Sequence, residues 1–353
     1  MAYSASAGKV RFGLIGCGEI GMQSADAIRQ SPELCSIAAV QDVAEDLAQD
    51  EGQRYSAPHY TDAGLLLQRE DVDAVLISTP HFLHGPLTVQ AARAGKHVAC
   101  EKPIACTRAQ ADEMIAACHE AGVFLSICYI LRYQAAITKA RELLQQEVIG
   151  RLIRYRCQIT ADKPASYWTG GYSQRVKTNW RMSKEKAGGG VLFMNGSHNL
   201  DRMHWITGLK PQRVFAEMDT FDTPVEVEDS ISLVLRYANG AIGSLDAMSC
   251  ARGGEGSCDR LYGTHGQMDV GQTLRVYTSR ADVPGVKPRQ WTDLNVPEEN
   301  PYVASRVRFF AEFAHAVRNG ATQGPIPGEE ARDTLDVCLA AYESARTHLP
   351  VNL

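Results

Sequence analysis

Hydrophobic and polar positions alternate over the first 128 residues as short apolar runs followed by longer stretches with helical spacing. The predicted strands cover residues 10–15, 37–40, 74–78, 97–100 and 123–129. The predicted helices cover residues 19–30, 43–52, 84–95 and 107–122, with Thr107 as the N-cap of the last. Short apolar strands between helices indicate crossover units on a buried parallel sheet. This part of the chain is therefore predicted to be an α/β, doubly wound domain.

The pattern changes after residue 128, where longer runs alternate between apolar and polar residues. The predicted strands cover residues 152–160, 212–218, 231–237, 241–248 and 260–263, with hairpins at 239–240 and 263–266. The predicted helices cover residues 135–146, 303–319 and 328–347, and the segment 187–206 is predicted to be helical after its glycines. The pattern predicts an α+β domain with a large, mostly antiparallel sheet. We expect two domains, residues 1–128 and residues 129–353.

Composition and charge exclude several classes of protein. The 353 residues are 44% hydrophobic and 22% charged, with a formal net charge of -5, as expected for a globular protein that binds neither nucleic acid nor a membrane. The segment 1–9 is small and polar, so we expect no secretory signal. The ten cysteines are scattered without a C-x-x-C pair, which favours reduced thiols in the cytoplasm over disulfides. No metal-ligand spacing is present among the ten histidines, so no metal site is predicted.

A glycine-rich turn joins the first predicted strand to the first helix, in the context expected of a dinucleotide site. Its candidate cofactor-binding residues are Gly16, Gly18, Glu19, Ile20 and Gly21. Asp42 ends the next strand, where a carboxylate accepts hydrogen bonds from the ribose hydroxyls of NAD and repels a 2′-phosphate. NAD is the predicted cofactor, although Arg54 leaves NADP possible. The alternative is a turn that binds no nucleotide, with Asp42 as a helix cap.

The ends of the next two strands carry further candidates, because ligands lie at the carboxyl ends of strands in a doubly wound sheet. The candidate cofactor contacts there are Ser78, Thr79, Pro80, His84, Glu101 and Lys102. For residues 78–80 and His84 the alternatives are an ordinary turn and a surface helix start. For Lys102 the alternative is a surface salt bridge to Glu101, which is disfavoured because adjacent residues at a strand end point to opposite sides.

These motifs resemble the glucose–fructose oxidoreductase and inositol dehydrogenase family, called Gfo/Idh/MocA. The resemblance runs from the glycine turn through residues 79–84, 94–98 and 101–103, and on through residues 188–201 to residues 261–266. It implies a Rossmann domain, then a sheet domain whose outer face often forms the contact of a homodimer or homotetramer. It also implies an active site between the domains at the nicotinamide, a cis Pro103, and Lys102 and His198 as catalytic residues.

One position departs from the family pattern. Members usually carry an aspartate four residues before the histidine, and here that residue is Met194. Asn195 lies on the same predicted helix face as His198, because residues three apart are neighbours. Asn195 is predicted to bind substrate or to orient the imidazole; alternatively, His198 works with Lys102 alone. Asp201 is expected to be a structural partner.

Aromatic and basic residues before the glycines suggest a sugar pocket, because aromatic faces suit sugar rings and arginine clamps carboxylates. Trp180 and Arg181 are predicted to bind substrate, with Tyr133 from the segment after the strand at 123–129. Arg132 is predicted to contact the cofactor. By contrast, Arg175, Lys177 and Lys184 are expected to lie in a solvated or interface-forming loop.

Together these features predict an NAD-dependent oxidoreductase that acts on a sugar, sugar acid or polyol. His198 would accept the hydroxyl proton during hydride transfer, and Lys102 would stabilise the developing alkoxide. Two alternatives stay open. One is elimination or glycoside cleavage through transient oxidation by bound NAD. The other is a protein that senses a dinucleotide without catalysis.

Overall fold

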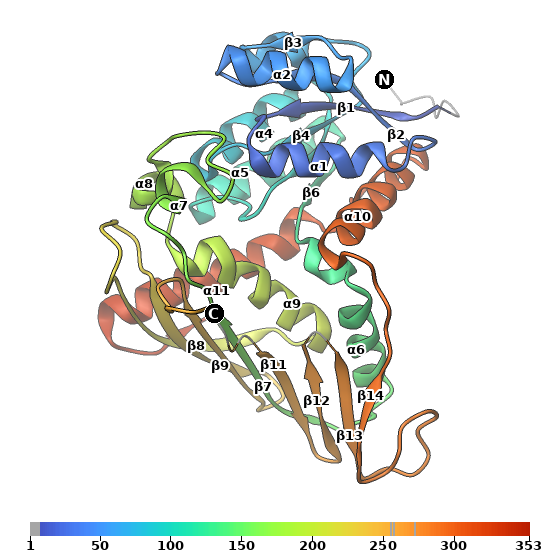
Figure 1. The fold of residues 1–353 in the computed structure, drawn as a ribbon, viewed down its shortest axis with the longest axis vertical. Helices are drawn as coiled ribbons and strands as arrows, with labels where there is room; N and C mark the ends of the chain where they lie inside the picture. The colour runs from blue at the N-terminus through green and yellow to red at the C-terminus, as the bar shows by residue number, and fades with distance from the viewer. Residues whose placement is uncertain (1–7, 255, 257, 272) are drawn as a thin grey trace. The chain divides into compact units, whose positions relative to one another are not determined.

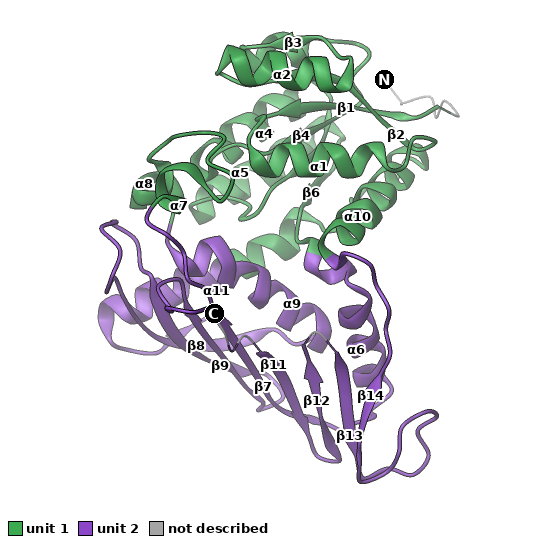
Figure 2. Ribbon diagram, viewed as in Figure 1, with its two compact units in different colours: residues 1–130, 166–188, 302–335 green, residues 131–165, 189–301, 336–353 purple. Residues whose placement is uncertain are grey.

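The computed structural model describes residues 8–254, 256, 258–271 and 273–353, so most of the segment 1–9 discussed above lies outside it. The chain divides into two units (Figure 2). Unit 1 contains residues 1–130, 166–188 and 302–335, and unit 2 contains residues 131–165, 189–301 and 336–353. This differs from the expected split into residues 1–128 and 129–353, because two later segments return to unit 1.

Unit 1 is built on a six-stranded parallel sheet with the order β3-β2-β1-β4-β5-β6 (Figure 1). Its strands are β1 (Val10–Ile15), β2 (Cys35–Gln41), β3 (His59–Tyr60), β4 (Ala74–Ile77), β5 (His97–Cys100) and β6 (Leu125–Ile127). All four residues of β4 are buried, as expected for a central parallel strand that is covered on both faces. The order reverses between β1 and β4, which is where such sheets bind ligands.

Helices connect these strands, in agreement with the predicted alternation. They are α1 (Glu19–Arg29), α2 (Glu45–Tyr55), α3 (Ala63–Leu67), the 3₁₀ turn η1 (His81–Leu83), α4 (His84–Arg93) and α5 (Arg108–Ala121). The predicted cap of α5 is confirmed, because the Thr107 side chain accepts a hydrogen bond from the Gln110 amide. The short β3 and α3 were not predicted; their few residues give too little periodicity.

Two returning segments complete unit 1. The first carries α7 (Tyr167–Gly170), the 3₁₀ turn η3 (Trp180–Met182) and α8 (Lys184–Ala187). The second carries most of α10 (Pro301–Arg318) and the start of α11 (Gly328–Thr347). Phe310 and Phe313 of α10 pack on Phe12 of β1 with ring centroids 5.8 and 5.4 Å away, and Phe313 lies 4.9 Å from Phe124. Burial of these rings fixes α10 on the parallel sheet.

Unit 2 is built on a nine-stranded sheet with the order β14-β13-β12-β11-β7-β10-β9-β8-β15. Its strands are β7 (Leu152–Thr160), β8 (Pro211–Asp219), β9 (Ser230–Tyr237), β10 (Ile242–Met248), β11 (Cys258–Gly263), β12 (Gly266–Val270), β13 (Leu274–Thr278), β14 (Trp291–Leu294) and β15 (Val351–Asn352). Neighbouring strands are antiparallel except β7 and β10, which are parallel. The predicted α+β class is confirmed.

The helices of unit 2 include the 3₁₀ turn η2 (Ile130–Tyr133), α6 (Ala135–Gln145), the π-helical turn η4 (Leu192–Gly196) and α9 (Ser197–Thr207). α6 contacts α9 and β12, and α9 contacts β7, so these helices cover one face of the sheet. The helix predicted after the glycines of the segment 187–206 is confirmed, although it opens with the π-helical turn η4 before α9. α8 ends at Ala187, and its C-cap Gly188 has a left-handed φ of +79°; helical structure resumes at Val191, directly after the glycines.

No helix in the described part of the chain combines the length and apolar character needed to cross a membrane. All ten cysteines are free; Cys250 and Cys258 are partly exposed and the others are buried.

Candidate active site

The turn between β1 and α1 has the geometry of a dinucleotide cradle. Gly16 has a φ of +95°, and a Cβ there would meet the carbonyl oxygen of Ser78 at 2.5 Å. A Cβ on Gly21 would overlap the carbonyl of Gly16. At Gly18, in contrast, the nearest atom to an added Cβ is the Val176 side chain at 4.0 Å. The turn is thus tight at its first and third glycines and open at the second, where a pyrophosphate has to approach the backbone.

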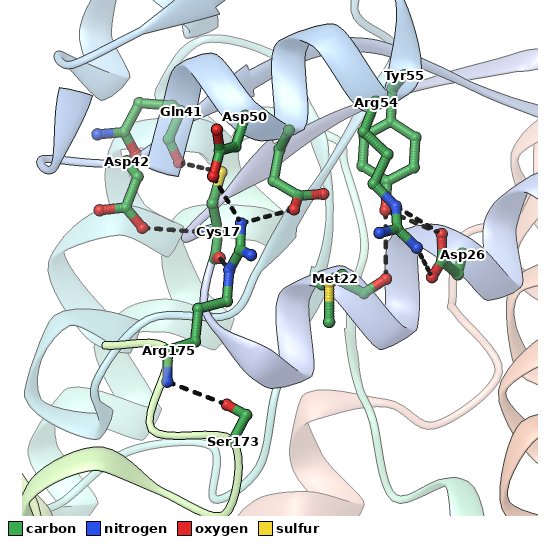
Figure 3. A network of polar contacts seen from close by, with 11 residues as sticks. Cys17, Met22, Asp26, Gln41, Asp42, Asp50, Arg54, Tyr55, Ser173 and Arg175 are labelled. Atoms are coloured by element: carbon green, nitrogen blue, oxygen red, sulfur yellow. Dashed lines mark hydrogen bonds and ion pairs between the residues drawn. The ribbon is translucent and has the colours of Figure 1, made fainter. Parts of the chain in front are cut away.

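Asp42 fixes this turn through its carboxylate (Figure 3). Oδ2 accepts a hydrogen bond from the Cys17 amide at 2.8 Å, and Oδ1 accepts one from the Ala44 amide at 2.9 Å. Each carboxylate oxygen still has a lone pair for a ribose hydroxyl. Arg54 does not compete for this position, because its guanidinium pairs with Asp26 at 2.5 Å. The contacts of Asp42 are compatible with NAD. Arg54, the basic residue that had left NADP possible, is engaged by Asp26.

The first turn of α1 places Glu19 and Ile20 directly after the open glycine, and both are partly buried. The Glu19 carboxylate accepts a hydrogen bond from the Ser173 amide at 3.0 Å. Glu19 therefore holds another part of unit 1 against the turn. Backbone amides at this end of α1 remain the natural donors to a phosphate.

Residues 78–80 follow β4 and are partly exposed, but His84 is fully buried. Its Nδ1 lies 2.8 Å from the carbonyl oxygen of Pro103, and its Nε2 lies 3.1 Å from that of Thr79. Burial lowers the pKa of His84, with both carbonyls opposing that shift. We expected His84 to contact the cofactor. In the structure, both ring nitrogens instead face backbone carbonyls, and the ring links the segments that follow β4 and β5.

Lys102 lies just after β5 and is followed by a cis peptide bond to Pro103. Burial lowers the pKa of Lys102 to about 8; Glu101 opposes that shift, whereas Arg306 and Arg181 add to it. Glu101 is buried and accepts a hydrogen bond from Arg306 Nη1 at 3.2 Å. Glu101 is therefore paired with Arg306 of α10. The positive charges of Arg306 and Arg181 favour the neutral form of Lys102.

Trp180 and Arg181 belong to unit 1 and lie close to the end of β4. The Trp180 ring is 4.6 Å from the ring of His81, whose Nδ1 lies 2.7 Å from the Ala187 carbonyl oxygen. The Arg181 guanidinium lies 4.6 Å from the Trp180 ring and 5.5 Å from the Tyr167 ring. Sequence reasoning missed His81 because its partners, Trp180 and Ala187, lie in a segment that is distant in the sequence.

The predicted residues of unit 2 lie on η4 and α9. Asn195 lies three residues before His198. The side chains of both residues are partly exposed, whereas Met194 is buried. Lys163, which follows β7 and is 4% exposed, donates a hydrogen bond to Asn195 Oδ1 at 2.6 Å. This lysine was missed, since a single lysine in a predicted loop normally indicates a solvated side chain. With its oxygen engaged, Asn195 keeps its amide nitrogen as a donor.

Arg132 and Asp201 form a buried bidentate pair in unit 2, with Nε–Oδ2 and Nη2–Oδ1 distances of 2.9 and 2.6 Å. The structural role expected of Asp201 agrees with this geometry. Arg132, expected to contact the cofactor, has its guanidinium edge committed to Asp201. Tyr133 is partly exposed at the end of η2. Among the described residues, no group of three or more His, Cys, Asp or Glu side chains could hold a metal ion.

Two models of known protein families match this chain. Residues 10–129 match the model of the oxidoreductase family with an NAD-binding Rossmann fold. Residues 137–269 match the GFO/IDH/MocA C-terminal domain. The chain belongs to the Gfo/Idh/MocA family. Its first domain is accordingly an NAD-binding oxidoreductase domain, in keeping with the open glycine and the placement of Asp42.

Relatives in this family differ in the reaction they catalyse. The chain is 27% identical over 247 residues to levoglucosan dehydrogenase from Pseudarthrobacter phenanthrenivorans, covering 63% of this chain and 62% of that protein. It is 29% identical over 205 residues to 2,7-anhydro-N-acetylneuraminate hydratase from Mediterraneibacter gnavus, covering 58% and 51%. The chain thus spans less than two thirds of either relative.

A solved structure of the same fold is that of aldose-aldose oxidoreductase from Caulobacter crescentus complexed with glycerol. It superimposes with a TM-score of 0.83 at 26% identity, and covers 98% of this chain and 100% of that one. The fold therefore matches over nearly the whole chain.

Proposed function

We propose that this protein transfers a hydride between NAD and a carbon that bears a hydroxyl or carbonyl group in a sugar, sugar acid or polyol. The observation that carries the proposal is the placement of Lys102, with a pKa of about 8, at the end of β5 in the unit that holds the glycine turn and Asp42. Bound nicotinamide would supply the hydride acceptor or donor. Gly16, Gly18, Gly21 and Asp42 would hold its dinucleotide.

Lys102 donates a hydrogen bond to the reacting oxygen and stabilises the charge that develops when a hydroxyl is oxidised. An ammonium group with a pKa near neutrality also exchanges protons readily at physiological pH. Trp180 and Arg181 bind the substrate, with the indole face toward a sugar ring and the guanidinium toward hydroxyl or carboxylate oxygens. The contact of Trp180 with His81 holds this pair in position.

In unit 2, His198 accepts the hydroxyl proton during oxidation and returns it during reduction. Asn195 offers its amide nitrogen to a substrate oxygen, because Lys163 occupies its Oδ1. Lys163 places a buried amino group against Asn195, which follows Met194, the residue at the position where the family usually has an aspartate. Tyr133 completes the substrate contacts, and Arg132 orders the start of unit 2 through Asp201.

A second function is favoured by one observation. The similarity to a hydratase indicates that the family includes proteins whose overall reaction is not a net oxidation. Transient oxidation by retained NAD, followed by elimination or glycoside cleavage and re-reduction, would use the same Lys102 and His198. A dinucleotide sensor remains the alternative if NAD binds and no substrate turns over.

The test is a substrate screen with NAD and NADP that follows the absorbance of reduced nicotinamide. The panel holds neutral sugars, polyols, sugar acids and glycosides, and product analysis runs in parallel. We expect NADH formation with one class of compound and a loss of about 10³-fold in kcat/KM for Lys102→Ala. Lys139→Ala, which removes an exposed lysine paired with Glu142 in unit 2, serves as the matched control.

The outcomes separate the candidates. NADH formation that Lys102→Ala abolishes and Lys139→Ala preserves supports the dehydrogenase. Product formation without accumulation of NADH supports the masked oxidation. Tight NAD binding without any product contradicts both enzymatic functions.

We also propose a cytoplasmic homodimer or homotetramer. The exposed face of the nine-stranded sheet carries Ile153, Phe215 and Val234, which are 47%, 38% and 49% exposed. These side chains line an open hollow together with Arg154, Arg156, Glu217 and Asp246. Apolar residues framed by both charges suit a self-complementary contact, and sedimentation analysis would report its size.

A further inference from the structure

Residues 170–178, called the strap below, form a loop that is closed on itself. The Thr178 amide donates a hydrogen bond to the Thr169 carbonyl at 2.7 Å, which joins the two ends of the loop. Inside it, Gln174 Nε2 donates to the carbonyls of Ser166 and Gly171 at 2.9 and 2.6 Å. The strap is therefore an ordered element, although it contains no strand and little helix.

Three contacts hold the strap against the dinucleotide turn. The Ser173 amide donates to Glu19 Oε2 at 3.0 Å, and Arg175 Nε donates to the Cys17 carbonyl at 3.2 Å. Val176 is the nearest side chain to the open face of Gly18. Figure 3 shows the strap, with Ser173 and Arg175, beside Cys17. The strap thus borders the position where the pyrophosphate of NAD has to lie.

Arg175 connects this loop to α2 as well. Its Nη2 donates to Glu51 Oε1 at 2.8 Å and lies 4.0 Å from Asp50 Oδ2. The Glu51 side chain is 2% exposed, whereas that of Arg175 is 23% exposed. Arginine has five N–H donors. Those that do not bind Cys17 or Glu51 have no hydrogen-bond partner in the described parts of the chain, and the exposure of the side chain leaves them accessible.

The charges around the turn explain why a cation is needed there. Asp42, Asp50 and Glu51 place carboxylates around Cys17 and Arg175, and Glu19 adds another at the start of α1. A dinucleotide brings two further negative charges on its pyrophosphate. Arg175 is a positively charged side chain that contacts this turn directly, and its planar fork suits phosphate oxygens.

We propose that Arg175 is a cofactor-binding residue and that the strap holds the ribose–pyrophosphate part of NAD against the glycine turn. Two donors of Arg175 fix the strap to Cys17 and Glu51, and the others bind phosphate or ribose oxygens. NAD then leaves only when the strap lifts from the turn. This inference rests on NAD being the cofactor of the proposed function, but it concerns the binding of NAD and not the chemistry at Lys102.

The test measures the binding of NADH to the full-length protein without substrate. Fluorescence titration gives Kd, and stopped-flow displacement by excess NAD gives the dissociation rate. We expect Arg175→Ala to raise Kd for NADH about tenfold, mostly through faster dissociation, because it removes charge-assisted hydrogen bonds and releases the strap. Arg175→Lys keeps the charge but loses the fork, so its effect should be intermediate.

Arg54→Ala is the matched control. It removes the ion pair between Arg54 and Asp26, which lies in the same unit but does not involve Asp42 of the glycine turn. It should leave Kd and the dissociation rate unchanged. If Arg175→Ala retains wild-type Kd and dissociation rate, the strap proposal is overturned.

Hydrogen–deuterium exchange on the wild type provides a second test that does not depend on the folding of a variant. We expect added NAD to slow exchange in residues 170–178, and unchanged exchange there would contradict the proposal. A wild type that binds no NADH overturns the strap and the proposed function together. NADH binding without turnover of any compound counts against the proposed catalysis alone.

Discussion

The protonation of Lys102 is the residue-scale feature that most directly links structure to chemistry. Burial disfavours the ammonium form, and the positive charges of Arg306 and Arg181 disfavour it further, whereas Glu101 opposes them. The net result is a pKa of about 8. A lysine in this range is charged at neutral pH and loses its charge within the range where enzymes are commonly assayed.

This environment predicts the pH dependence of turnover. If charged Lys102 donates to the substrate oxygen, kcat/KM falls as the pH rises through about 8. Arg181→Gln removes a cation that lowers the pKa, so it should move this alkaline limb to higher pH. The measurement is kcat/KM against pH for wild type and variant. An alkaline limb that stays in place, or moves to lower pH, would contradict the assigned electrostatics.

Arg175 and Lys163 show where prediction of single residues failed. We expected Arg175 to be solvated together with Lys177 and Lys184. The two lysines are exposed, but Arg175 reaches Cys17 and the buried Glu51. Lys163 is buried against Asn195. In each case the partner is distant in sequence, and a single basic residue in a polar loop carries no sign of such a partner.

At the scale of elements, α10 is attached to the parallel sheet by charge as well as by its phenylalanines. Arg306 Nη1 donates to Ser24 Oγ at 2.7 Å and to Glu101 Oε1 at 3.2 Å, and its Nη2 donates to the Tyr302 hydroxyl at 3.1 Å. Arg306 and Glu101 are both buried. The residue before Lys102 is therefore held by a helix from the far end of the chain.

Removal of one member of this pair should destabilise unit 1. Glu101→Gln leaves the buried charge of Arg306 uncompensated, and we expect the free energy of unfolding to fall by about 3–5 kcal/mol. Denaturant unfolding measures this change. Glu343→Gln, which removes the partner of the exposed Arg346, should have no measurable effect. Equal effects of the two substitutions would show that the Glu101–Arg306 pair does not anchor α10.

The predicted elements with strong periodicity are the ones that the structure reproduces. β1, β5 and β7 have the predicted bounds, and α11 does as well. The helix predicted after the glycines of the segment 187–206 begins at Val191, directly after Gly190. Gly190 lies so close to the Glu228 carbonyl that a Cβ would overlap it, and the Glu228 carboxylate accepts hydrogen bonds from the Gly190 and Leu192 amides. A tertiary contact, invisible to local periodicity, sets where that helix begins.

At the scale of the whole molecule, the chain leaves unit 1 and returns to it twice. Residues 166–188 bring Trp180, Arg181 and the strap to the Rossmann sheet, and residues 302–335 bring α10. Unit 1 is consequently not a product of the first 130 residues alone. Contacts at its glycine turn come from the first of these segments, and part of its core comes from the second.

This organisation predicts the behaviour of fragments. Residues 1–130 alone lack α10, so Phe12 and Phe124 lose the cover of Phe310 and Phe313. We expect this fragment to unfold without cooperativity and to bind a hydrophobic dye, as proteins with incomplete cores do. Circular dichroism melting and dye fluorescence check this, with co-expression of residues 301–335 as the rescue. A fragment that melts cooperatively by itself would refute the dependence on α10.

The sequence by itself determined the alternation of strands and helices, the glycine turn with Asp42, the family, and the positions of Lys102 and His198 along the chain. These features are local, because periodicity, turn chemistry and short motifs depend on residues near one another. Only the tertiary structure decided that Glu101 pairs with Arg306, that His84 braces two strand ends, and that Arg175 binds Glu51 beside the turn. Those pairings depend on which distant segments pack together, and packing is decided by burial over the whole fold.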